Sequence, residues 1–172
     1  MGDNTLRTII YGQGAHVDPL ACIEDVPVQL AVRTVAGYPH SIWQIVEHMN
    51  YWMDYDLSKI AGEDRPYPTK ASESWVAGQN SISAENFTDA EWKTTTRRFS
   101  SFLVRLAELA EADSTTLEKK IKNIGPAKAD HDSTVHALLW QITAHNSYHT
   151  GQIAMLRRQF GAWPPERGGD TW

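Results

Sequence analysis

The sequence predicts an all-α protein, a four-helix bundle, and three observations lead to this prediction. Four segments among its 172 residues carry apolar side chains at intervals of three and four, which is the spacing of one helix face. Two of these segments begin with a capping box, in which Ser or Thr is followed three residues later by Gln or Glu. No segment alternates convincingly as a strand does, and we find no internal repeat. We therefore expect one bundle domain over residues 1–172.

The first helix is expected between about residues 17 and 35, after a polar lead-in that ends at Gly14. Its apolar stripe is imperfect. Pro27 lies inside it, and a proline in a helix interior removes a hydrogen bond, so we expect a kink or a split there. Gly37, Tyr38 and Pro39 then interrupt the chain.

The second helix begins with the capping box at Ser41. His48 lies three residues after Ile45 and four before Trp52, both of which belong to the apolar face. We therefore expect the imidazole of His48 to point into the core. His40 precedes the cap and is expected to be a surface or loop residue.

A long connection and a third helix follow. Residues 61–87 are rich in Gly, Pro and Ser and show no sustained periodicity. A connection of this length either covers a functional site or is a packed crossover that Trp75 anchors. The third helix begins with a capping box at Thr88 and is expected to end near Ala112, without a histidine on its apolar face. A polar linker over residues 113–132 leads to the last helix.

The last helix, over residues 134–160, carries two histidines four residues apart. His145 and His149 fall on the same stripe as Leu138, Ile142 and Ile153, so both imidazoles are predicted to point inward. One buried histidine is easily satisfied by a single carbonyl, whereas two on one inward face indicate a shared partner such as a metal ion. The spacing is that of the zincin H-E-x-x-H motif, but Asn146 replaces the glutamate that acts as general base there. This replacement excludes a zincin-type metalloprotease.

Composition excludes several other classes of function. The net charge is −5 and the chain has no dense patch of Lys and Arg, so we expect no nucleic-acid partner. Cys22 is the single cysteine, which rules out an internal disulfide. The first ten residues lack the basic start and long apolar run of a signal peptide, and no apolar run approaches the length of a membrane span. We expect a cytoplasmic protein with no membrane contact.

The inward histidines of the second and fourth helices together predict a metal site. His48, His145 and His149 would supply three protein ligands, which leaves a position open for water or substrate, as in catalytic rather than structural metal sites. Imidazole ligands suit several divalent ions, and three histidines do not choose between Ni, Zn, Fe and Mn. Gln152 lies one turn after His149 and Gln141 one turn before His145. Either glutamine is placed to orient a substrate or to hydrogen-bond the second nitrogen of a histidine.

Three motifs carry a resemblance to a known family. They are SIWQIVEH at residues 41–48 followed by Trp52, HNSYHTGQI at residues 145–153, and FGAWPP at residues 160–165. From about residue 5 to its C-terminus the chain resembles the DinB/YfiT family of metal-dependent enzymes. The resemblance implies a bundle with up-down-down-up helix order and a divalent metal held by one histidine of the second helix and an H-x-x-x-H pair of the fourth. His48, His145 and His149 fill these positions.

The resemblance also implies an activity. The family includes transferases that use a low-molecular-weight thiol such as bacillithiol, mycothiol or glutathione. Our hypothesis is that a metal at the three histidines lowers the pKa of a thiol, or of water in a hydrolase, for attack on an electrophilic small molecule. The alternative is a non-catalytic metal-binding or stress-related protein. DinB-like proteins are often dimers, and Trp163 and Trp172 would either pack over the bundle or line a second subunit of a homodimer.

Overall fold

The computed structural model describes residues 4–75, 86–122, 125 and 132–169. The described chain is mainly helical, with a single two-stranded ladder, which confirms the all-α class. In chain order the elements are α1 (Asn4–Ile10), α2 (Ala21–Glu24), α3 (Val28–Ala31), α4 (Ile42–Ala61), the 3₁₀ turn η1 (Ala71–Ser74), α5 (Asp89–Ala110), α6 (Ser114–Leu117), β1 (Lys120–Ile121), β2 (Ser133–Thr134) and α7 (Val135–Gln159).

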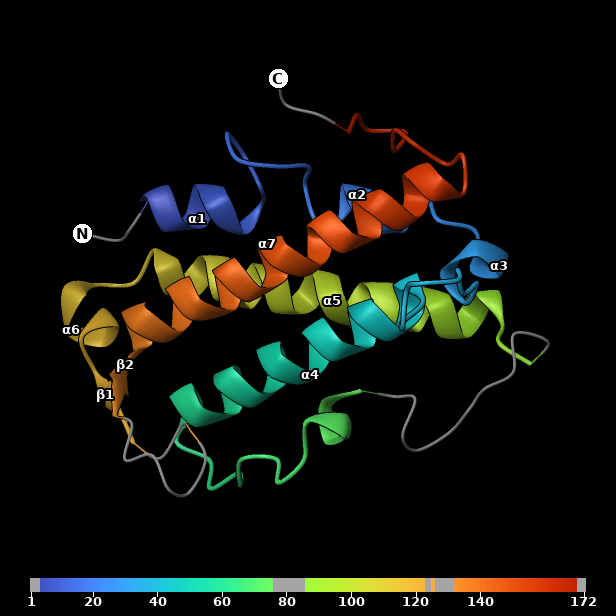
Figure 1. Ribbon diagram of the computed structural model, residues 1–172. Helices are drawn as coiled ribbons and strands as arrows, with labels where there is room; N and C mark the ends of the chain where they lie inside the picture. Colours follow the sequence, from blue (N-terminus) through green and yellow to red (C-terminus); the bar gives the residue numbers. More distant parts are fainter. Residues whose placement is uncertain (1–3, 76–85, 123–124, 126–131, 170–172) are drawn as a thin grey trace.

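Three long helices, α4, α5 and α7, form the body of the molecule. In Figure 1, α4 and α5 run in one direction, and α1 and α7 run in the opposite direction. Each long helix begins where its sequence predicted. The hydroxyl groups of Ser41, Thr88 and Thr134 accept hydrogen bonds from backbone amides three residues later, so each satisfies a donor of the first turn that has no partner within the helix.

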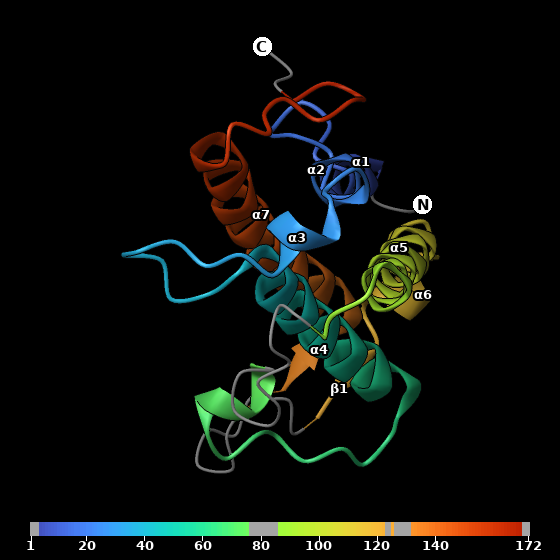
Figure 2. The ribbon, with the colours of Figure 1, turned by 90° about the vertical axis from the view of Figure 1, so that its right-hand side faces the viewer.

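The helix expected over residues 17–35 is split at Pro27, as predicted, but its two pieces are much shorter than expected. This region holds two short helices, α2 and α3, and Pro27 lies between them as the extended N-cap of α3. A proline has no amide hydrogen, so it begins a helix readily but does not continue one. The polar lead-in contains a helix that we did not predict, α1, whose Leu6 and Ile10 are buried. As Figure 2 shows, α1 lies between α5 and α7 and contacts both, while α2 contacts α7, so α1 takes the place of the missing long helix.

The chain reverses after α4. Gly62 ends this helix in the left-handed conformation, with φ 90°, which glycine adopts without steric penalty. The following segment then returns along α4, and η1 lies beside that helix (Figure 1). Residues 76–85 of the predicted 61–87 connection, and Trp172 of the tail, lie outside the described residues. Among the helices of the described residues, none is long and apolar enough to cross a bilayer.

Candidate metal centre

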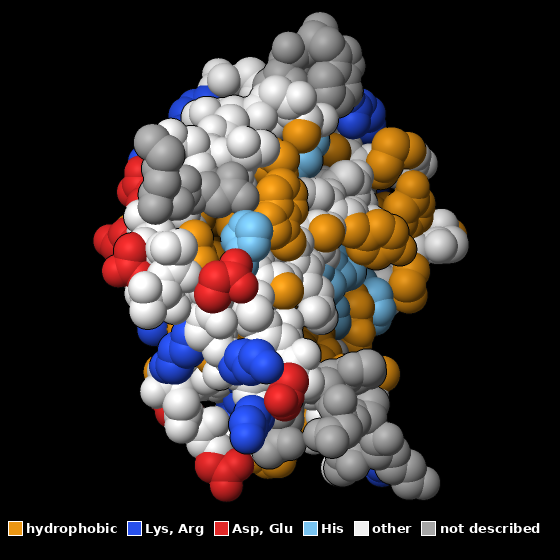
Figure 3. All heavy atoms as spheres, turned by 90° about the vertical axis from the view of Figure 1, so that its left-hand side faces the viewer, with side chains coloured by type: hydrophobic (Ala, Val, Ile, Leu, Met, Phe, Trp, Pro, Cys, Tyr) orange, Lys and Arg blue, Asp and Glu red, His pale blue; other side chains and the backbone are white. Residues whose placement is uncertain are grey.

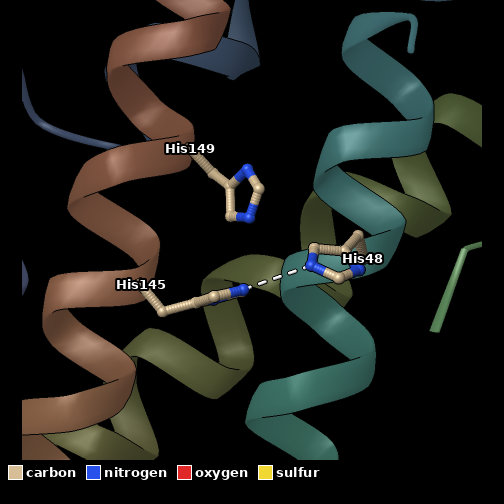
Figure 4. A group of neighbouring side chains, drawn as sticks. All are labelled: His48, His145 and His149. Carbon is tan, nitrogen blue, oxygen red and sulfur yellow. Dashed lines mark hydrogen bonds between the residues drawn. The ribbon is translucent and has the colours of Figure 1, made fainter. Parts of the chain in front are cut away.

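Three imidazole rings meet between α4 and α7. His48 comes from α4, and His145 and His149 come from successive turns of α7, with the rings directed toward one another (Figure 4). One nitrogen from each ring lies within 4.8 Å of the other two. The Nε2 atoms of His48 and His145 are 3.2 Å apart. The structure therefore brings together the three histidines that helical spacing placed on inward faces.

Hydrogen bonds outside the cluster fix the orientation of two rings. The Nδ1–H of His48 donates to the carbonyl oxygen of Ser74 over 3.0 Å, and the Nδ1–H of His149 donates to Oε1 of Gln152 over 2.7 Å. The Nδ1 of His145 has only a long contact of 3.5 Å with Oδ1 of Asn146. Because Nδ1 carries the proton in His48 and His149, the Nε2 lone pairs of these two rings are available for a ligand inside the cluster.

The cluster fits a tetrahedral divalent ion. With metal–nitrogen bonds of about 2.0–2.1 Å, two ligands of a tetrahedron lie about 3.3 Å apart. The 3.2 Å between the Nε2 atoms of His48 and His145 is close to this value. The third nitrogen lies within 4.8 Å of the other two, so it would have to move about 1.5 Å closer at most to become a ligand of the same ion. The cluster can therefore hold an ion with three nitrogen ligands, which leaves a fourth position for another molecule.

The surroundings keep all three rings neutral. Burial, reinforced by the other histidines, lowers the pKa of His48 to about 3. Burial, with a smaller effect of His149, lowers the pKa of His145 to about 4. Burial also lowers the pKa of His149. Neutral imidazole is the form that binds metal ions, so near pH 7 an ion displaces few protons from these rings.

A tryptophan from the 61–87 connection covers one side of the cluster. The Trp75 ring stacks on His48, with centroids 3.8 Å apart and an interplanar angle of 8°. His40 stacks on the other face of Trp75, at 3.6 Å and 10°. Our expectation that His40 is a surface or loop residue was therefore incomplete, because its ring is half-buried and its Nδ1 is buried without a hydrogen-bond partner. This part of the connection covers the histidine site.

A pocket opens beside His145. Its volume is about 260 Å³, and α4, α7 and the connection after α4 all contribute to its wall. The lining residues are Trp52, Tyr55, Asp56, Tyr67, Leu138, Gln141, Ile142 and His145. Figure 3 shows histidine side chains at the molecular surface, set among hydrophobic ones. The candidate residue Gln141 thus lies in the pocket wall, whereas Gln152 lies behind His149.

The sequence analysis did not predict that Asp56 lines the pocket or that the Ser74 carbonyl binds His48. Asp56 is buried in the pocket wall, and burial raises the pKa of its carboxyl group to about 7. Its position carried a signal, because it follows His48 by eight residues and Trp52 by four, which is the spacing of one helix face. Ser74 acts through its backbone carbonyl, and no side-chain pattern could have predicted that contact.

Comparison with known proteins adds one finding. A family model described as the DinB family matches residues 34–168, a span that covers most of the chain and contains all three histidines. No curated protein and no solved structure matches the chain. The match begins after α1, α2 and α3, so it rests on the three long helices and their connections.

Proposed function

The chain belongs to the DinB family, and we propose that it is a metalloenzyme that transfers a low-molecular-weight thiol to an electrophilic small molecule. His48, His145 and His149 would hold one divalent ion. The observation that carries this proposal is the convergence of three neutral imidazoles beside an open pocket. When bound, the ion supplies Lewis-acid chemistry that lowers the pKa of a thiol or a water molecule.

The chain's own residues prepare this site. Ser74 and Gln152 hold the rings of His48 and His149 with their Nε2 atoms toward the cluster, so little reorganisation is needed on binding. Trp75 covers one face of His48 and keeps water from that side. The pocket receives the electrophile beside His145, the most accessible of the three ligands.

The pocket favours an enzyme over a protein that only binds metal. A sequestering or sensor site needs ligands but no cavity for a second molecule. Here His145 lines a cavity of about 260 Å³, so a small molecule can approach the nitrogen ligands directly. A hydrolase would use the same ligands and pocket, with water in place of the thiol.

The first test is metal content, measured by mass spectrometry on protein purified without a nickel column. We expect about one ion per chain in the wild type. His149→Ala should lose most of it, whereas His136→Ala, a histidine of the same helix outside the cluster, should keep it. A wild-type protein that holds no metal, and takes up none on addition of Zn, Ni or Mn, would contradict the proposal.

The second test separates thiol transfer from the other activities. Cobalt-loaded protein is saturated with glutathione, bacillithiol or mycothiol, and its absorption spectrum is recorded. A thiol that enters the open position should add a sulfur-to-metal band, because thiolate is a strong ligand for such ions. A spectrum that none of the three thiols changes would exclude the transferase and leave a hydrolase or a binding protein.

A further inference from the structure

The pocket beside His145 contains a carboxylate without a counter-ion. Asp56 lies on α4, two turns after His48, and its side chain is only 7% exposed. Among the described residues, none donates a hydrogen bond to this carboxylate or forms an ion pair with it. A buried charge is costly unless it is paired, so this position favours a ligand that brings a positive charge or a strong donor.

The two cations nearest after Asp56 along the chain are engaged elsewhere, and the Nζ of Lys59 lies over the ring of Tyr55, 5.9 Å from its centroid. Arg65 donates to Asp54 over 2.8 Å, and its guanidinium lies over the rings of Tyr51 and Tyr55. The pocket wall itself contains no Lys or Arg, and its one basic side chain, His145, is kept neutral by burial. An anionic group would therefore meet Asp56 with no compensating charge, whereas a cationic group would meet its counter-ion.

Three aromatic residues contribute to the same wall. The Trp52 and Tyr55 rings lie 5.6 Å apart, Trp52 and Tyr67 5.6 Å, and Tyr55 and Tyr67 5.9 Å, measured between centroids. Aromatic ring faces attract ammonium groups, and such clusters are a common way to bind them. A carboxylate among these rings adds the charge that discriminates an amine from an uncharged molecule of the same shape.

We propose that this pocket binds the ammonium group of a small amine substrate, with Asp56 as its counter-ion and the three aromatic rings as its wall. The inference rests on the proposed function in one respect, which is that the reactive end of this amine would lie at the histidine cluster. The volume of about 260 Å³ restricts the ligand to a small molecule. Asp56 is thus a substrate-binding residue.

The test uses three probes of equal length, butylamine, butan-1-ol and butyrate, titrated calorimetrically into metal-free protein at pH 8. Burial raises the pKa of Asp56 to about 7, so at pH 8 the carboxyl group is mainly ionised. We expect butylamine to bind about tenfold or more tightly than butan-1-ol, and butyrate not to bind. Asp56→Asn should abolish this preference while keeping the shape of the pocket. Asp64→Asn, in the exposed segment after α4, should leave it unchanged.

Three results would overturn the inference: no probe binds, butylamine and butan-1-ol bind equally, or Asp56→Asn keeps the preference. Circular dichroism of each variant establishes that it is folded. Because the titrations use metal-free protein, their outcome is independent of the metal measurement. A protein that holds metal but shows no amine preference refutes only this inference. Amine preference without metal uptake refutes only the proposed metalloenzyme.

Discussion

Two regions of α7, its middle around His145 and His149 and its C-terminal end around Arg157, bury polar side chains in different ways. Near its C-terminal end, Arg157 is 3% exposed and forms a two-pronged ion pair with Asp25 from the segment after α2. Its remaining donors reach the carbonyl oxygens of Cys22 and Ala162. Asp25 also accepts a hydrogen bond from the backbone amide of Glu166. This network connects α2, α7 and the tail.

The middle of α7, which carries His145 and His149, differs from this completed network. The rings of His48 and His149 are hydrogen-bonded on their outer sides, whereas on the inner side the three rings meet only one another, with 3.2 Å between the Nε2 atoms of His48 and His145, and no carboxylate from the described residues lies among them. Buried polar groups are normally paired, and the Nε2 of His149 has no donor among the described residues, so the cluster favours an external partner. The comparison shows that burial alone does not identify a functional site. What distinguishes the two regions is whether the protein itself supplies hydrogen-bond partners for all of their buried polar groups.

The largest expected effect comes from breaking the completed network. Asp25→Ala leaves the Arg157 guanidinium buried without its counter-ion, which should lower the free energy of unfolding by about 3–5 kcal/mol. Glu24→Ala, which removes the neighbouring exposed pair with Arg167, should lower it by less than about 1 kcal/mol. Urea unfolding measures both. Equal losses in the two variants would show that burial does not distinguish these pairs, and metal content should change in neither.

A smaller effect is expected from removing the hydrogen bond that holds the His149 ring from outside the cluster. Gln152→Leu removes the acceptor that orients His149, so metal affinity should fall about 10–100-fold. Gln159→Leu, an exposed position at the end of the same helix, is the matched control and should keep wild-type affinity. Competition with a chromogenic chelator measures both affinities. Wild-type affinity in Gln152→Leu would mean that this hydrogen bond does not position the ligand.

The smallest expected effect is a change in how the stability of the metal-free protein depends on pH. The pKa values of about 3 for His48 and about 4 for His145 lie below the ordinary 6.5, so below pH 6.5 the unfolded chain binds more protons than the folded one. Metal-free protein should therefore lose stability as the pH falls from about 6.5 to about 4.5. The pKa of Asp25 is lowered from 3.8, mainly by its hydrogen bond with Arg157 outweighing burial, so its contribution is lost only at more acidic pH.

Asp56 changes stability with pH in the direction opposite to the histidines, so its titration must be eliminated by substitution before their effect is measured. Its pKa is raised to about 7, so it stabilises the folded state as the pH falls through that value. The comparison is therefore between Asp56→Asn and the double variant Asp56→Asn/His145→Asn, by urea unfolding with a chelator present. The double variant should lose stability less steeply below pH 6.5. Identical slopes would mean that His145 is not held neutral by the fold.

The long helices were predictable because their signals are local. The capping boxes at Ser41 and Thr88 and the apolar spacing behind them predicted where α4 and α5 begin, and apolar spacing from residue 134 onward predicted α7. The split at Pro27 was predicted, but the length of the first helix was not, because its apolar stripe is imperfect. The region instead forms two short helices, of which α2 packs against α7 and α3 against α4 and α5. The short, polar sequence of α1 gave no comparable signal, since its helix is stabilised by contacts with α5 and α7.

The candidate site was predictable to the same extent. Helical spacing placed His48, His145 and His149 on inward faces, and the structure brings them together. The stacking of Trp75 between His40 and His48 depends on how a long irregular segment returns to α4, which periodicity does not encode. That segment therefore became part of the site only through tertiary structure.

His48 and His145 are 97 positions apart along the chain, and this separation has a mechanical consequence. An ion bound to both would link two distant parts of the folded chain, and it would be released when the chain unfolds. Unlike a disulfide, which also constrains the unfolded chain, the ion would stabilise the fold through its binding free energy, by about 2.7 kcal/mol at a free ion concentration 100 times its Kd. The chain has one cysteine and forms no disulfide within itself. Its cross-link would instead be reversible, so the stability of the folded chain would follow the supply of divalent ions in its surroundings.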